Sequence, residues 1–168
     1  MSKMSLKEII IDCLGKVKGK DVLVSGGLSS LVSFWNINDY THQHSVKGYI
    51  VFGSTHMIEL SNGNIALSSF TKPHPIVIID SSSYQFVTMI QLEEYFTYCS
   101  SLCVFDEHSF IYAYEGTFLQ ISNEDGRVLF HSKGGKFDGY RGILPLEGGK
   151  YFAISNKKRI SIIKPCYA

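Results

Sequence analysis

Short apolar runs alternate with clusters of turn residues along most of the chain. The clusters include Ser61-Asn62-Gly63-Asn64 and Asn123-Glu124-Asp125-Gly126, whose Asn, Asp and Gly residues tolerate the positive φ of tight hairpin turns. The runs between them, such as Asn64–Ser69, Pro75–Asp80 and Arg127–Ser132, are rich in Val, Ile, Leu and Phe. Runs of this length bounded by turn residues are typical of β-strands. The pattern predicts an all-β fold of short antiparallel strands.

The apolar runs repeat at a nearly constant interval. When they are aligned, Trp35, Ile79, Ile121 and Ile163 form one column, separated by 44, 42 and 42 residues. The next column is Asn36, Asp80, Ser122 and Lys164. A repeat of about 40–45 residues with four strands in each unit is the signature of propeller blades. The spacing therefore predicts a β-propeller built from four antiparallel strands per blade, with four units and the last one incomplete.

The segment Leu23–Asp39 resembles the second and third strands of a WD40 repeat. In that family a small-residue strand end, a polar loop and a further strand lead to a Trp-Asp pair, and here the pair is Trp35-Asn36. The other units carry Ile79-Asp80, Ile121-Ser122 and Ile163-Lys164. The resemblance covers roughly Asp21 to Pro165 and is carried by spacing and strand order more than by motif letters. It implies a repeat scaffold that binds proteins or peptides through loops on one face.

The chain divides into an N-terminal segment, residues 1–20, and WD40-like blades over residues 21–168. Ser5-Leu6-Lys7-Glu8 matches a capping box, which favours a short helix. Ile9-Ile10-Ile11 and the strand count of a blade favour a strand instead. We expect the strand, as the first of the first blade, with the helix as the alternative.

The fourth unit lacks an outer strand, because only Cys166-Tyr167-Ala168 follow its third run. An open sheet exposes pairing edges and apolar area, and propellers typically need 4–8 blades to close. Three states remain open: a small closed ring, half of a larger ring completed by a second copy or a partner chain, or a fragment of a longer protein.

Composition limits the class of partner. Hydrophobic residues make up 45% of the chain and charged residues 18%, with a formal net charge of +1. This balance gives no support for nucleic acid or an anionic membrane as a partner. No apolar run reaches the roughly 18 residues of a membrane helix. Four sparse cysteines favour a reducing intracellular compartment, which we expect to be the cytoplasm, with the nucleus left open.

Two groups of residues are candidates for a metal site, and both have a simpler interpretation. Cys99, Cys103 and His108 form a C-x3-C-x4-H cluster, but no second close pair completes a tetrahedral zinc site, so Cys103 is expected in the core. His42 and His44 lie two residues apart and are expected to share one face of an outer strand, exposed rather than metal-bound. We expect no metal and no cofactor.

Catalytic motifs are not evident in the sequence, which contains neither a nucleophile elbow nor a phosphate-binding loop. We therefore expect a non-enzymatic scaffold. The rival hypothesis is an enzyme or ligand-binding propeller with a site at the central channel, where Glu59, Asp106 and Glu147, at the ends of three inner strands, could converge.

The candidate protein-binding residues are aromatic and lie in connecting segments. Aromatic and Arg side chains on loops dominate interface hot spots, although aromatics also tuck between blades. The candidates are Phe70, Tyr95, Phe96, Phe137, Tyr140 and Arg141.

Overall fold

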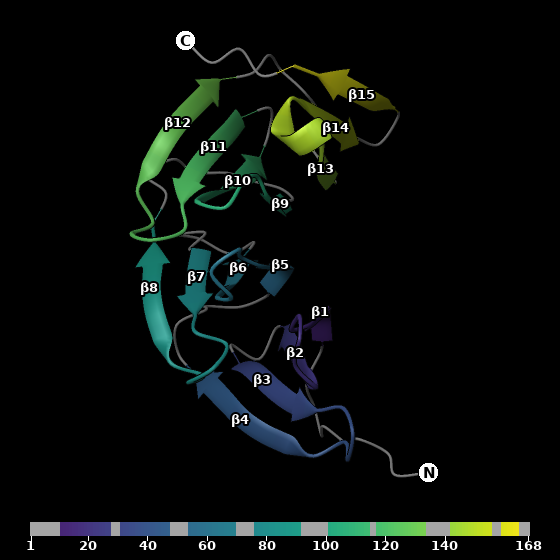
Figure 1. Ribbon diagram of the computed structural model, residues 1–168, viewed down its shortest axis with the longest axis vertical. Helices are drawn as coiled ribbons and strands as arrows, with labels where there is room; N and C mark the ends of the chain where they lie inside the picture. Colours follow the sequence, from purple (N-terminus) through teal and green to yellow (C-terminus); the bar gives the residue numbers. More distant parts are fainter. Residues whose placement is uncertain are drawn as a thin grey trace.

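The computed structural model describes residues 11–27, 31–47, 54–69, 76–91, 101–114, 117–133, 142–155 and 159–164. Within these ranges the chain forms fifteen β-strands and one short 3-10 helix, arranged in four antiparallel sheets (Figure 1). The protein is therefore all-β, and its sheets are propeller-like blades, as the spacing of the apolar runs predicts.

Each sheet is a meander in which consecutive strands are neighbours. The first sheet contains β1 (Ile11–Lys16), β2 (Val22–Gly27), β3 (Leu31–Asn36) and β4 (His42–Lys47). The second contains β5 (Ser54–Glu59), β6 (Ile65–Ser69), β7 (Ile76–Ile79) and β8 (Phe86–Ile90). The third contains β9 (Ser101–Val104), β10 (Ser109–Tyr114), β11 (Thr117–Ser122) and β12 (Val128–Lys133). The fourth contains β13 (Gly142–Leu146), the helix η1 (Glu147–Gly149), β14 (Tyr151–Ser155) and β15 (Ile160–Ile163).

The ends of the repeat also have a defined structure. Residues 11–16 of the N-terminal segment form a strand, β1, which pairs with β2; residues 1–10 lie outside the described residues. The fourth sheet has three strands within the described residues, so the last unit is incomplete, as predicted.

The four sheets follow one another along an open arc (Figure 1). The first strands of the sheets, β1, β5, β9 and β13, contact one another in sequence order. The last strands, β4, β8 and β12, lie on the outer side of the arc. The first and fourth sheets are at the two ends of the arc, so each has one face against a neighbouring sheet and one face directed away from the arc.

Three of the four residues in the column that revealed the repeat pack their sheet on the one before it. Ile79 lies in a core cluster with first-sheet residues, Ile121 in a cluster with the second sheet, and Ile163 against the third. The residue before each column member points the other way, so Phe34 packs towards the second sheet and Ile78 towards the third. The regular spacing of these apolar residues therefore reflects the contacts that pack one sheet against the next.

The following column begins the turn between the third and fourth strands of each sheet. The side chains of Asn36, Asp80 and Ser122 each accept hydrogen bonds from backbone N–H groups two or three residues further on. These are Asx and Ser/Thr turns, which explains why short polar residues recur in this column. The fifth residue of each turn has a positive φ: 60° at Tyr40, 58° at Tyr84 and 72° at Gly126.

A β-bulge follows the same turn in each of the first three sheets and corrects one prediction. In the first sheet Phe34 pairs with His44 but Trp35 pairs with His42, so Gln43 is the extra residue. Because neighbouring residues of β3 face opposite sides, the two histidines do not share a face. His44 stacks on Tyr84 of the second sheet, with ring centroids 5.7 Å apart, whereas His42 lies edge-on to Trp35 at 5.0 Å.

Candidate functional site

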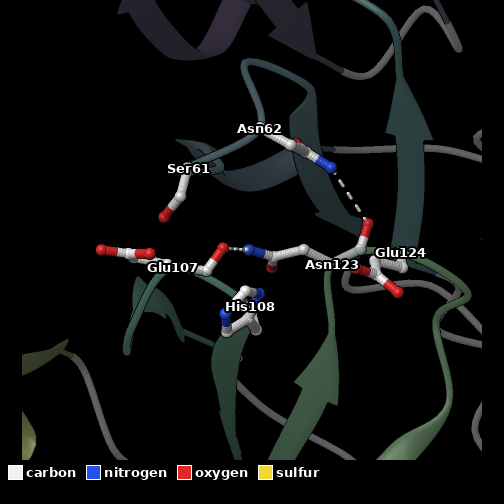
Figure 2. Close-up of a pocket in the computed structure, with 6 residues that line it drawn as sticks. All are labelled: Ser61, Asn62, Glu107, His108, Asn123 and Glu124. Carbon is white, nitrogen blue, oxygen red and sulfur yellow. Dashed lines mark hydrogen bonds between the residues drawn. The ribbon is translucent and has the colours of Figure 1, made fainter.

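A pocket of about 320 Å³ opens between the second and third sheets (Figure 2). Three turns from distant parts of the chain form it: the β5–β6 turn, the β9–β10 turn and the β11–β12 turn. Its lining residues are Ser61, Asn62, Glu107, His108, Asn123 and Glu124.

Hydrogen bonds between the turns fix the shape of the pocket. The Ser61 hydroxyl donates to the backbone carbonyl of Asp106 at 2.9 Å, and the Asn62 side-chain amide donates to the carbonyl of Asn123 at 3.2 Å. Asp106 holds its own turn by accepting from the His108 backbone N–H at 2.8 Å and from the Ser109 hydroxyl at 2.7 Å. The pocket walls are therefore fixed before any ligand arrives.

Asn123 is the buried centre of this arrangement, with only 3% of its surface exposed. Its backbone N–H donates to the His108 carbonyl at 2.8 Å, and its side-chain nitrogen donates to the Glu107 carbonyl at 3.1 Å. The second bond sets the orientation of the amide, because the reverse orientation would place two carbonyl oxygens against each other.

The side-chain oxygen of Asn123 has no hydrogen-bond partner among the described residues. A buried acceptor left unpaired costs about 1–3 kcal/mol, and this oxygen has almost no surface that a molecule in the pocket could reach. The carboxylates of Glu107 and Glu124 are exposed at the rim, and they attract positive charge. The rim of the pocket is therefore suited to a cationic group.

The three acids considered for a central channel have separate local roles. Glu59 accepts a 2.6 Å hydrogen bond from the backbone N–H of Lys18, which ties the second sheet to the β1–β2 turn of the first. Asp106 stabilises the β9–β10 turn, and Glu147 begins η1 with a φ of 47°. A second cavity, of about 150 Å³, lies near Glu59 between the first two sheets, and it is lined largely by apolar residues that include Val17, Val24, Met57, Ile58 and Ile65.

Metal-ligating side chains do not gather in the part of the chain that the structure describes: no group of three or more His, Cys, Asp or Glu could hold an ion there. Cys103 is buried in a core cluster between the third and fourth sheets, as the sequence predicts, and burial raises the pKa of its thiol to about 12. Cys99 lies outside the described residues. The described residues also contain no helix that is long and apolar enough to span a membrane.

The six candidate protein-binding residues predicted from the sequence, Phe70, Tyr95, Phe96, Phe137, Tyr140 and Arg141, all lie outside the described residues. The strand ends that flank them, such as Ser69 and Ile76, are at the opposite edge of the sheets from the turns that form the pocket. The pocket was not predicted from the sequence, because its residues come from three separate turns. A recurrent Asn in polar turns, at Asn62 and Asn123, was the available signal.

Comparison with known proteins supports the fold. No protein-family model matches the sequence, and no curated protein matches it. Among solved structures, 765 chains match. One is described as the structure of U3-55K; it superposes with a TM-score of 0.73 at 14% sequence identity, over 96% of this chain and 54% of that chain. The chain thus spans about half the length of that solved structure, and at this identity the likeness concerns the fold alone.

Proposed function

We propose that the chain is a WD40-like propeller segment that acts as a non-catalytic scaffold for a protein or peptide partner. The observation that carries the proposal is the pocket between the second and third sheets, with the exposed Glu107 and Glu124 at its rim. The repeated blades and the WD40-like order of Leu23–Asp39 support the scaffold class. Fold alone does not give function, so the partner chemistry is argued from the pocket.

The partner group that suits this pocket is a Lys or Arg side chain. The exposed carboxylates of Glu107 and Glu124 offer negative charge and hydrogen-bond acceptors at the rim. A hydrogen bond that involves a charged group contributes about 1.5–3 kcal/mol, more than one between neutral groups. The aromatic candidates, Tyr95 and Phe137 among them, lie outside the described residues and remain a predicted second contact surface.

A peptide library tests this proposal. Peptides selected by the immobilised chain should be enriched in Lys or Arg, and replacing the selected basic residue by Met should weaken binding. The double variant Glu107→Gln with Glu124→Gln should lower the affinity roughly twofold to thirtyfold, because each exposed charge contributes about 0.2–1 kcal/mol. Fluorescence anisotropy of a labelled selected peptide measures the change.

The matched control is Asp12→Asn with Glu147→Gln, which removes the same charge from exposed positions outside the pocket. This variant should bind as tightly as the unmodified chain. If the selected peptides carry no basic preference, and both variants bind them equally, the proposed site is wrong.

We also propose that the chain works in a reducing compartment, the cytoplasm or the nucleus, without a nucleic-acid or membrane partner. Within the described residues Cys13 and Cys103 are free thiols, and burial raises the pKa of Cys13 to about 11, which suppresses its reactive thiolate. Recovery of the native chain from a secreted fraction would contradict this location.

A further inference from the structure

The fourth sheet has one covered face and one bare face. Ile143, Phe152 and Ile154 are buried against the third sheet. On the other face Leu144, Ala153 and Ile162 lie in one row across the three strands, with Ile160 on the same side. Leu144, Ile160 and Ile162 are exposed at 60%, 74% and 60%. This is a larger apolar surface than a solvated sheet face normally carries.

In the first and second sheets the corresponding face is covered by the following sheet. Ile162 precedes the column residue Ile163, as Phe34 precedes Trp35 and Ile78 precedes Ile79. Phe34 and Ile78 are exposed at only 0% and 1%, because each is covered by the following sheet. Val32 and Ile76 occupy the position of Ile160 and are also buried, at 1% and 0%. The bare face of the fourth sheet is therefore a surface of the kind that accepts the next blade.

The first sheet carries the complementary surface at the other end of the arc. Tyr84 joins the second sheet to the first: its ring lies 4.5 Å from the ring of Phe34, and its hydroxyl donates to Gln43 Oε1 at 3.0 Å. Tyr40 has the same place in its own turn and the same positive φ, yet it is 57% exposed. Leu14, on the outward face of the first sheet, is 60% exposed, whereas Trp35 and Ser25 on that face are 6% and 4% exposed. Leu14 and Tyr40 are therefore the exposed apolar part of this end.

Charge at the two ends is also complementary. Between the first two sheets, Lys20 of the β1–β2 turn donates to the Ser81 carbonyl at 3.1 Å and to the Ser82 hydroxyl at 2.8 Å, both in the β7–β8 turn. The corresponding turn of the fourth sheet has the exposed Lys150, and the β3–β4 turn of the first sheet has the exposed Asp39. A fourth sheet placed before a first sheet would bring these opposite charges towards each other.

We propose that two copies of this chain join head to tail, the fourth sheet of each copy covering the first sheet of the other, to close a ring of eight blades. Eight blades are within the usual range for a closed propeller. Two identical contacts related by a twofold axis leave no open end.

Variants at each end of the arc test this proposal. Sedimentation and native mass spectrometry of the full chain should give twice the 18.8 kDa of one copy. The fourth-sheet variant (Ile160→Asp with Ile162→Asp) and the first-sheet variant (Leu14→Asp with Tyr40→Asp) should each raise the dimer dissociation constant by at least about 100-fold, because each loses two buried apolar side chains from the contact. Circular dichroism checks that the separated copies stay folded.

Two further measurements make the result specific to a head-to-tail ring. The control variant Val87→Asp with Leu129→Asp changes two outer-strand residues of similar exposure, 44% and 45%, and should stay dimeric. A mixture of the two end variants should form mixed dimers, since one intact contact remains between them. A wild-type chain that stays at 18.8 kDa, an open polymer, or a dimer unaffected by either end variant would overturn the proposal. The peptide-binding test does not depend on this outcome, because the pocket lies within one copy.

Discussion

Tyr84 and Gly126 occupy the same position in two successive blades, but the space between the sheets is filled in opposite ways at these two residues. Each is the fifth residue of its turn and has a positive φ, at 58° and 72°. Tyr84 fills the space towards the first sheet with its own ring, at 4.5 Å from Phe34. At Gly126 the preceding sheet fills the space instead: a Cβ there would lie 2.8 Å from Cγ1 of Ile90.

The backbone geometry of this turn is therefore more constant between blades than the type of side chain at its fifth residue. The turn, its polar first residue and the bulge after it recur in the first three sheets. The residue with the positive φ can be Tyr or Gly, provided that the neighbouring sheet fills the space that remains. A matched pair of substitutions can separate the cost of the positive φ from the contribution of packing against the neighbouring sheet.

Gly126→Ala should have the largest effect, a loss of about 3 kcal/mol in the free energy of unfolding. A left-handed backbone costs an L-residue about 1–2 kcal/mol, and the contact with Ile90 adds about 1–3 kcal/mol of overpacking. Gly63→Ala is the control, since Gly63 has a φ of 83° but a Cβ there would meet nothing within 4 Å. Urea denaturation should show a loss of about 1 kcal/mol for Gly63→Ala; equal losses would mean that Ile90 does not pack on Gly126.

Tyr84→Gly should cost about 2 kcal/mol. The loss of the ring contacts with Phe34 and His44, each aromatic pair contributing about 0.5–1.5 kcal/mol beyond its buried area, exceeds the relief of the positive φ. Tyr40→Gly makes the same backbone change where the ring is exposed, so at dilutions that keep the chain monomeric it should leave stability unchanged or raise it by less than ~1 kcal/mol. Thermal melts of both variants measure the difference, and a similar loss from both would refute the role given to Tyr84.

Asp80→Ala should cost less than ~1 kcal/mol at neutral pH, since this carboxylate is largely solvent-screened. Hydrogen bonds from the backbone N–H groups of Ser83 and Ser82 lower the pKa of Asp80 below its usual 3.8. Because the folded pKa lies below the unfolded one, the contribution is present above about pH 3.8 and is lost as the pH falls through the folded pKa.

Asn36→Ala is the matched change in the first sheet, where an amide oxygen that does not titrate accepts the corresponding bond. Stability curves measured against pH should therefore converge with the wild type in acid for Asp80→Ala but not for Asn36→Ala. If Asp80→Ala remains less stable than the wild type well below the folded pKa, the Asp80 carboxylate is not what stabilises the turn.

The sequence predicted the fold well because its signal is periodic. Trp35, Ile79, Ile121 and Ile163 recur at the interval of one blade, and the last three of them lie where one sheet packs on the preceding one. The bulges were not predictable, because one extra residue in an outer strand leaves the strand composition unchanged. For that reason the relation between His42 and His44 was predicted wrongly.

The pocket could not be predicted for a different reason. Asn62 and Asn123 come together only when the second and third sheets pack, and nothing in the sequence links two turns that lie about sixty residues apart. The left-handed tyrosines were also missed, since Tyr40 and Tyr84 are residue types that rarely adopt a positive φ.

The second and third blades each dock on the preceding blade through the same position of the same turn. Nuclear Overhauser contacts in the unmodified chain test it most directly. The structure predicts cross-peaks between the Tyr84 and Phe34 rings and between the Gly126 Hα protons and the Ile90 side chain. If both pairs are absent while the strand pairings within each sheet are present, the sheets do not pack as described.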